Sequence, residues 1–361
     1  MKDSKKISVW LWLLTIFLFL SASVLLLKQT RTRTPKDDYE QMYQAAVQAD
    51  KAFTAIRKER LHRGHSISPV DDPCNTGLIG DSYTEITTTL GSLEAKRSST
   101  NPNTAAMVVE LLNQCNVKKG DLVAVNLSSS FPAMNIAVLC ALDSIGADGI
   151  IINSVGASTY GANLPDFTYL DMEQLLLNEG IIKNHTTAFS LGGADDIGRE
   201  MPEEIKNAII HRLKDYGLTF LYEEDLNENI AARQAIYEAK GTPVCFINAG
   251  GNLLSFGGGT EMISAHNGLI LPGQDKLPSD AAGLIPLYLE KNIPVIHLLN
   301  MKSLLPANGL PFDPQPLPKP GEGDVYTSWH YNRPLAALLL MGGLGMLILL
   351  SRYLPKKRMP L

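Results

Sequence analysis

Three consecutive serines, Ser128 to Ser130, stand where chemistry is expected in an α/β protein. They follow the apolar segment 122–127, which predicts a buried strand, and they precede a helix expected over 131–145, with Pro132 in its first turn. Ligands of open α/β sheets bind at such a point. A serine here can cap the helix, help its N–H groups to bind an anion, or act as a nucleophile. The flanking glycines of a nucleophile elbow are absent. Capping is therefore the favoured role of these serines, anion binding ranks second, and nucleophilic attack ranks third.

The segment 80–103 is the densest polar stretch of the chain. Its lysine and arginine could neutralise an anion, while its hydroxyl groups and the N–H groups of the next helix could orient it. A solvated loop that caps the helix expected over 104–116 is the alternative, and the residues leave both interpretations open. The candidate ligand-binding residues of this segment are Thr88, Thr89, Lys96 and Arg97.

A second candidate loop, 248–252, follows the apolar segment 243–247, which predicts another buried strand. Its glycines would let a ligand approach the backbone, although ordinary turns also explain them. Neither this loop nor the glycine run 257–259 matches a dinucleotide-binding or P-loop pattern, so we expect no nucleotide cofactor. With Ser129 from the serine run, the candidate ligand-binding residues of these loops are Asn248, Gly250, Gly251 and Asn252.

The seven histidines show no spacing typical of a metal site, and we expect neither a metal nor another cofactor. His185 and His266 are the candidate general bases. A hydrolase or transferase site would combine one of them with a serine nucleophile and with a carboxylate, Glu94 or Asp195, that orients the base. The catalytic candidates are therefore Ser128, Ser130, His185 and Glu94.

The order of the predicted elements defines the fold class. Helix, strand, serine loop, helix and strand follow one another from 104 to 155, which is the order of a βαβ unit. Further helices are expected over 170–178, 203–216, 230–239 and 281–291, and a further strand over 294–299. This alternation predicts an α/β domain over 76–305, a Rossmann-like sandwich around a parallel sheet.

Both ends of the chain are strongly hydrophobic. The run 7–27 has no charged residue and reaches the ~20 residues that a spanning helix needs, and the run 334–350 is similar. We expect one transmembrane helix at each end, the first of them uncleaved, with a stalk helix and linker over 28–75 and a proline-rich linker over 306–333. Basic residues directly after the second run favour tails inside the cytoplasm and a main domain outside it. The net charge of −5 argues against a nucleic-acid partner.

Long stretches of the sequence resemble a known bacterial family. The runs TGLIGDSYTEITTTLGSLEAKRSSTNPN, KKGDLVAVNLSSSFPAMNIAVL and NSVGASTYGANLPDFTYLDME are similar to those of the poly-gamma-glutamate system protein family, and the similarity extends over nearly the whole chain. This resemblance implies a role in making, exporting or handling poly-γ-glutamate at the cell envelope, in the bacterial cytoplasmic membrane. It supplies no catalytic residue to carry over.

Three hypotheses follow from the residues and the resemblance together. The first is an accessory component that contacts the polymer or the membrane subunits of its synthase, with cationic groups such as Lys96 and Arg97 facing the polymer carboxylates. The second is a serine-dependent hydrolase or transferase acting on γ-glutamyl amide bonds. The third is a scaffold for the synthase, held through the glycines of the second hydrophobic helix. The expected partners are thus the polymer, the synthase subunits and the lipid bilayer.

Overall fold

The computed structural model describes residues 2–256, 267–273 and 282–353, so the candidate base His266 and the glycine run 257–259 lie outside the described residues. The chain forms two compact units. One combines the two ends, Met1–Asp37 and Thr327–Leu361, and the other is the body, Asp38–Tyr326.

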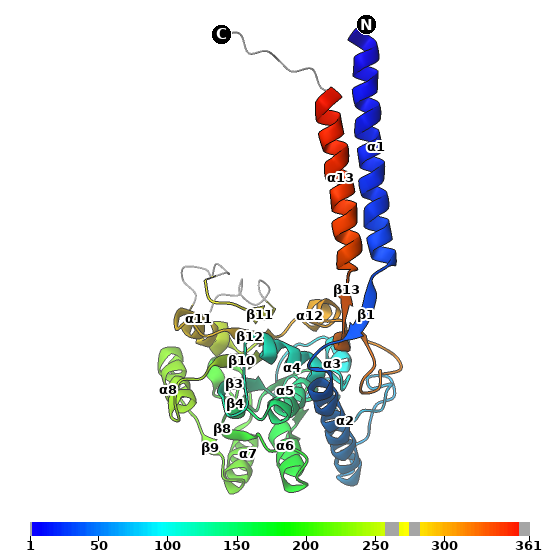
Figure 1. The fold of residues 1–361 in the computed structure, drawn as a ribbon. Coiled ribbons are helices and arrows are strands. Elements are labelled where there is room, and N and C mark those ends of the chain that lie inside the picture. Colours follow the sequence, from blue (N-terminus) through cyan, green and yellow to red (C-terminus); the bar gives the residue numbers. More distant parts are fainter. Residues whose placement is uncertain (1, 257–266, 274–281, 354–361) are drawn as a thin grey trace. The chain divides into compact units, whose positions relative to one another are not determined.

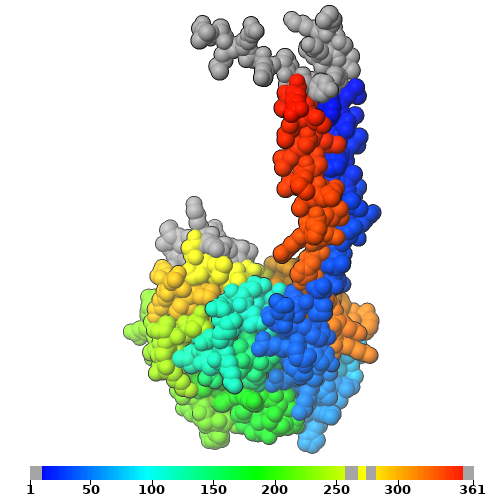
Figure 2. All heavy atoms as spheres, in the orientation of Figure 1, coloured from blue at the N-terminus to red at the C-terminus, as the bar shows by residue number. Residues whose placement is uncertain are grey.

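The terminal unit is a pair of helices joined at their base by a short sheet. Strands β1 (Thr32–Pro35) and β13 (Thr327–His330) pair antiparallel, and helices α1 (Lys2–Gln29) and α13 (Arg333–Tyr353) lie side by side (Figures 1 and 2). Within them, Trp10–Gln29 and Arg333–Arg352 are long and apolar enough to cross a membrane. Their apolar side chains are mostly exposed, which distinguishes them from the core helices of a soluble domain. The prediction of an apolar helix at each end is confirmed.

The body is built on a seven-stranded sheet, all of whose neighbouring strands are parallel except the edge strand β11. The predicted α/β class with a mostly parallel sheet is therefore confirmed. From one edge to the other the strands are β11 (Gly268–Ile270), β12 (Val295–Leu298), β10 (Cys245–Ala249), β3 (Leu122–Ser128), β4 (Asp148–Ser154), β8 (Thr186–Ser190) and β9 (Thr219–Phe220).

Helices cover both faces of this sheet (Figure 1). Because side chains alternate along a strand, Val123, Val125 and Leu127 enter one apolar core while Ala124 enters the other. The first core is closed by α2 (Tyr39–His62), α4 (Thr104–Gln114), α5 (Pro132–Ile145), α6 (Tyr169–Asn178) and α7 (Glu203–Asp215). The second is closed by α8 (Leu226–Glu238), α9 (Leu253–Phe256) and α11 (Leu284–Glu290).

The chain changes direction across the sheet between β3 and β10. It runs from β3 outward through β4 and β8 to β9, and α8 then returns it to β10, on the other side of β3. The loops that follow β3 and β10 therefore part from each other at the carboxyl edge of the sheet, which is where open α/β sheets form a crevice.

The structure places the limits of the body further out than the domain boundaries expected at 76 and 305. The expected stalk helix is α2, which packs on α4 and α5 through a fully buried stripe that includes Met42, Ala49 and Ile56. The proline-rich segment also packs on the body, where the Tyr326 hydroxyl donates to Asn103 Oδ1 at 2.5 Å. Alanines allow this close helix packing, because their small side chains let the helix axes approach each other.

Short elements complete the body near the carboxyl edge of the sheet. They are β2 (Thr87–Thr89) paired with β5 (Ala157–Ser158), β6 (Asn163–Leu164) paired with β7 (Phe167–Thr168), the helices α3 (Leu93–Ser99) and α12 (Met301–Ala307), and the single 3₁₀ turns η1 (Ala194–Asp196) and η2 (Asp324–Tyr326).

Candidate functional site

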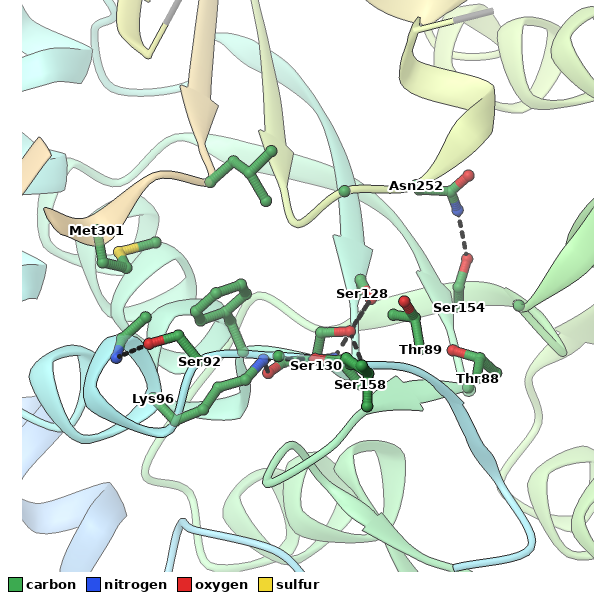
Figure 3. A pocket seen from close by; sticks show the side chains of 18 of the residues that line it. Thr88, Thr89, Ser92, Lys96, Ser128, Ser130, Ser154, Ser158, Asn252 and Met301 are labelled. Carbon is green, nitrogen blue, oxygen red and sulfur yellow. Dashed lines mark hydrogen bonds between the residues drawn. The ribbon is translucent and has the colours of Figure 1, made fainter. Parts of the chain in front are cut away.

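A cavity of about 650 Å³ opens at the carboxyl edge of the sheet. Its walls come from the ends of β3 and β4, from the loops after β8, β10 and β12, and from the segment that runs from β2 into α3. Figure 3 shows Asn252 and Met301 on one side of this space, and Lys96 with Ser130 and Ser158 on the other. The cavity thus lies at the point where the chain reverses its direction across the sheet.

The lining of the cavity is rich in hydroxyl groups and glycines and has a positive charge. Two lysines, Lys96 and Lys302, belong to it, and none of the described lining residues is an aspartate or a glutamate. This is notable in a chain with 37 acidic and 32 basic residues. The described hydroxyl and amide side chains of the lining are Thr88, Thr89, Ser92, Ser128, Ser130, Ser154, Ser158, Asn252 and Asn300.

Lys96 is the buried charge of the cavity. It is 2% exposed, and its Nζ donates to Ser158 Oγ at 2.6 Å and to the carbonyl of Ser130. The ammonium group also lies 3.7 Å from the centre of the Phe131 ring. No carboxylate of the described residues forms a salt bridge with it, and burial lowers the pKa of Lys96 to about 7. A neutral amine is therefore a substantial fraction of this group near pH 7.

Three serines surround the end of the Lys96 side chain. The Ser130 hydroxyl accepts from the Ser158 N–H at 3.0 Å and from Ser128 Oγ at 3.0 Å, which leaves its own O–H free to donate. Gly91 supports this arrangement, because a Cβ at Gly91 would lie 2.8 Å from Ser158 Oγ and 3.1 Å from Lys96 Cε. The local backbone is thus built to let these side chains meet.

A buried ion pair holds the opposite wall of the cavity. Asp196 Oδ2 accepts from Arg233 Nη2 at 2.6 Å, and both side chains are almost completely buried. Asp196 Oδ1 accepts from the hydroxyl of Ser154 at 3.0 Å, and Ser154 in turn accepts from Asn252 Nδ2 at 2.9 Å. The pair therefore fixes two side chains that line the cavity, Ser154 and Asn252 (Figure 3).

Asparagines connect this wall to the interior of the sheet. Asn126 accepts from Arg233 Nη1 at 2.7 Å and donates to Asn248 Oδ1 at 2.9 Å. Asn248 lies 3.1 Å from His297 Nδ1, and burial lowers the pKa of His297 to about 4. His297 is therefore a neutral member of a structural network behind the cavity.

Most of the ligand-binding residues proposed from the sequence gather at the cavity. Five of these nine residues line it, namely Thr88, Thr89, Lys96, Gly251 and Asn252, and the catalytic candidates Ser128 and Ser130 line it as well. Ser129, Asn248 and Gly250 lie behind its surface. The Ser129 hydroxyl donates to Asn153 Oδ1 at 3.1 Å, and Gly250 packs on Ser128.

Arg97 points away from the cavity, although it is the neighbour of Lys96 in α3. Its guanidinium donates to both carboxylate oxygens of Asp313, at 2.8 and 2.5 Å, and the pKa of Arg97 is raised mainly by this hydrogen bonding. Successive residues of a helix point about 100° apart, so two adjacent side chains cannot both face one ligand. Arg97 is better described as a link between α3 and the proline-rich segment than as a ligand-binding residue.

Among the described residues, the candidate base His185 and the candidate carboxylates Glu94 and Asp195 lie apart from the serines, while the other candidate base, His266, lies outside the described residues. His185 is exposed, hydrogen-bonds to the carbonyl of Lys183 and borders a separate cavity with Glu173. Glu94 is an exposed residue of α3 that accepts from the Ser92 hydroxyl. Asp195 pairs with Arg199 near the surface. None of these three residues lines the cavity that contains the serines.

Sequence inspection missed Ser158 and Lys302, and it missed the partnership of Asp196 with Arg233. Ser158 was detectable in principle, since it lies four residues after the strand that ends at Ser154, at the carboxyl edge where sites form. Arg233 gave no signal, because a lone arginine in an amphipathic helix normally faces solvent.

No group of three or more His, Cys, Asp or Glu side chains is placed to hold a metal ion in the part of the chain that the structure describes. In comparisons with known proteins, no family model, no curated protein and no solved structure matches this chain.

Proposed function

We propose that the protein is a membrane-anchored component of a poly-γ-glutamate synthesis or export system, and that its cavity binds a segment of the polymer. The observation that carries this proposal is the composition of the cavity, which combines two lysines with hydroxyl groups and has no acidic side chain among its described lining residues. A carboxylate-bearing chain needs such a site, because an acidic wall would repel it.

The volume and position of the cavity agree with a binding role. About 650 Å³ lies in the range of small-molecule sites, and the carboxyl edge beside a reversal of strand order is where Rossmann-like sheets bind ligands. Lys302 is exposed and would meet carboxylates as they enter, whereas Lys96 lies at the buried end. The negative net charge of the chain agrees with a confined site rather than a wide polyanion-binding face.

The two apolar helices support the membrane part of the proposal. Each reaches 20 residues at high mean hydropathy, and we propose that they anchor the protein in the bacterial cytoplasmic membrane with the body outside the cytoplasm. The resemblance of the sequence to the poly-gamma-glutamate system protein family supports the choice of polymer.

The test is binding of purified full-length protein in detergent micelles to short poly-γ-glutamate, measured by calorimetry at low and moderate salt. Lys302→Met should weaken binding about threefold and Lys302→Glu about tenfold, and added salt should reduce both differences. Lys240→Met is the matched control, because Lys240 is exposed on the body and is not a lining residue. Absence of binding by the wild-type protein, or equal binding by Lys302→Glu, would overturn the proposal.

A further inference from the structure

We propose that the cavity is also an acyl-transfer site, in which Ser158 is the nucleophile and Lys96 its general base, acting on an amide whose acyl part carries a carboxylate. The carboxylate in this substrate class rests on the proposed function, whereas the serine–lysine pair rests on geometry alone.

The geometry of the pair is that of a base in contact with its nucleophile. Lys96 Nζ and Ser158 Oγ lie 2.6 Å apart, within the range of a direct proton transfer, and both residues line the cavity. They come from separate elements, α3 and β5, and Gly91 leaves the room that their contact needs. Ser128 and Ser130 line the same cavity, but neither has a hydroxyl hydrogen bond to a base in the described structure.

A buried lysine can serve as a base only if it loses its proton near neutral pH. Burial without a carboxylate partner lowers the pKa of Lys96 to about 7, which is suited to this role. A purely structural lysine would be expected to have an anionic partner, because an isolated buried ammonium is costly. Of the described charged residues, Glu94 and Arg97 share its helix, with Arg97 paired to Asp313, and Lys302 of α12 lines the same cavity.

The reaction proceeds by two proton-balanced steps. Ser158 Oγ attacks the amide carbonyl carbon while its proton passes to neutral Lys96, and the free Ser130 O–H donates to the developing oxyanion. The C–N bond then breaks, the ammonium of Lys96 returns the proton to the leaving amine, and an ester on Ser158 remains. Water attacks this ester while Lys96 takes its proton. The C–Oγ bond then breaks, Lys96 returns the proton to Ser158 Oγ, and the carboxylic acid product leaves and ionises in solution. An amine in place of water would give transfer.

The position of the lysines indicates which part of the substrate lies where. Lys302 is the exposed lysine of the lining, so the substrate carboxylate would face it, whereas the scissile carbonyl would reach the buried Ser158. Neutral Lys96 would then be free to act as base rather than as a partner for the carboxylate.

The experiment uses the full-length protein in detergent micelles and a fluorescent fluorophosphonate, which labels activated serines. At pH 8.5 we expect labelling at Ser158, located by peptide mass spectrometry, with a loss of at least about 100-fold in Ser158→Ala and Lys96→Met. Ser66→Ala and Lys240→Met are matched controls on the exposed surface, and both should label like the wild type. Labelling of the wild type should also rise with pH around an apparent pKa near 7; this second readout does not depend on any variant folding.

Three results would overturn the proposal: no labelling of the wild type, labelling at a serine other than Ser158, or undiminished labelling of folded Lys96→Met. Polymer binding is measured separately on the same samples. Polymer binding by the wild type tests the proposed function on its own, and the loss of labelling in Ser158→Ala and Lys96→Met tests catalysis. Labelling of Ser158 without any polymer binding would leave the acyl-transfer site in place and refute the proposed polymer.

Discussion

The carboxylate of Asp196 and the guanidinium of Arg233 meet at 2.6 Å in the interior of the body, where their side chains are 2% and 0% exposed. Arg233 comes from α8 on one face of the sheet, and Asp196 from the turn η1 that follows β8. Their hydrogen bonds to Asn126, Ser154 and Ser190 join the strands β3, β4 and β8 beneath the cavity. The pair thus connects the packing of a helix to the shape of the candidate site.

Breaking this buried pair should be costly. Asp196→Ala leaves a buried, unpaired guanidinium and should reduce the free energy of unfolding by about 3–5 kcal/mol. Arg199→Ala is the matched control, because it removes the exposed partner of the adjacent Asp195 and should cost at most about 1 kcal/mol. Unfolding of the two full-length variants in guanidinium chloride measures both free-energy losses. Similar losses in the two variants would show that the buried pair has no special role.

The burial of Lys96 should make stability depend on pH. The pKa of Lys96 is 10.5 in the unfolded chain and about 7 in the folded protein. Between pH 7 and pH 10.5 the unfolded state therefore binds more protons than the folded state. Stability of the wild type should therefore rise relative to Lys96→Met as the pH increases, by about 2 kcal/mol from pH 7 to pH 9. Unfolding of both proteins at a series of pH values gives this difference. If the stability difference between the wild type and Lys96→Met does not change from pH 7 to pH 9, the pKa of Lys96 is not lowered in the folded protein.

The same proton should control the contribution of Lys96 to polymer binding. At pH 6 the group is an ammonium and attracts carboxylates, and at pH 8.5 it is mostly neutral. Lys96→Met should thus weaken poly-γ-glutamate binding about tenfold at pH 6 and hardly at all at pH 8.5. Lys302→Met provides the comparison, since the loss of an exposed lysine should have the same effect at both pH values. Calorimetry at the two pH values would refute this if the Lys96→Met effect did not change.

His297 should limit stability in acid. Burial lowers its pKa from 6.5 to about 4, so the unfolded state gains the proton first as the pH falls. The wild type should lose about 3 kcal/mol relative to His297→Leu between pH 6.5 and pH 4. Thermal or denaturant unfolding at both pH values checks this, and a parallel loss in the two proteins would assign the acid sensitivity to other groups.

Adjacent glycines in the loop after β10 should respond differently to substitution. Gly250 has a φ of +107° and an added Cβ would lie 2.7 Å from Ser128 Cβ, so Gly250→Ala should destabilise the protein by about 1–3 kcal/mol and displace Ser128. Gly251 has no positive φ, and its Cβ would meet only Leu299 at 3.5 Å. Gly251→Ala should therefore stay within about 0.5 kcal/mol of the wild type in an unfolding experiment. Equal losses would argue against the close approach at Gly250.

The sequence by itself predicted the strands that became β3, β4, β10 and β12 and most of the helices between them, but not the strands β8, β9 and β11. A short apolar run such as 122–127, bounded by turn residues and rich in valine and leucine, favours a buried strand, and it is one. The sequence also predicted an apolar helix at each end, because the length and hydrophobicity of such a run can be read without knowing its tertiary contacts. The serine run and the loop 248–252 could be placed at one edge of the sheet because the carboxyl ends of parallel strands share that edge.

Only the tertiary structure decided which of these polar residues face the cavity. Lys96 and Arg97 are neighbours of similar charge, yet helical geometry turns one toward Ser158 and the other toward Asp313. The Lys96–Ser158 contact joins residues 62 positions apart, and it depends on β2 pairing with β5. Hydrogen bonds act over about 3 Å, so such contacts are set by packing between distant segments, on which local sequence patterns carry no information.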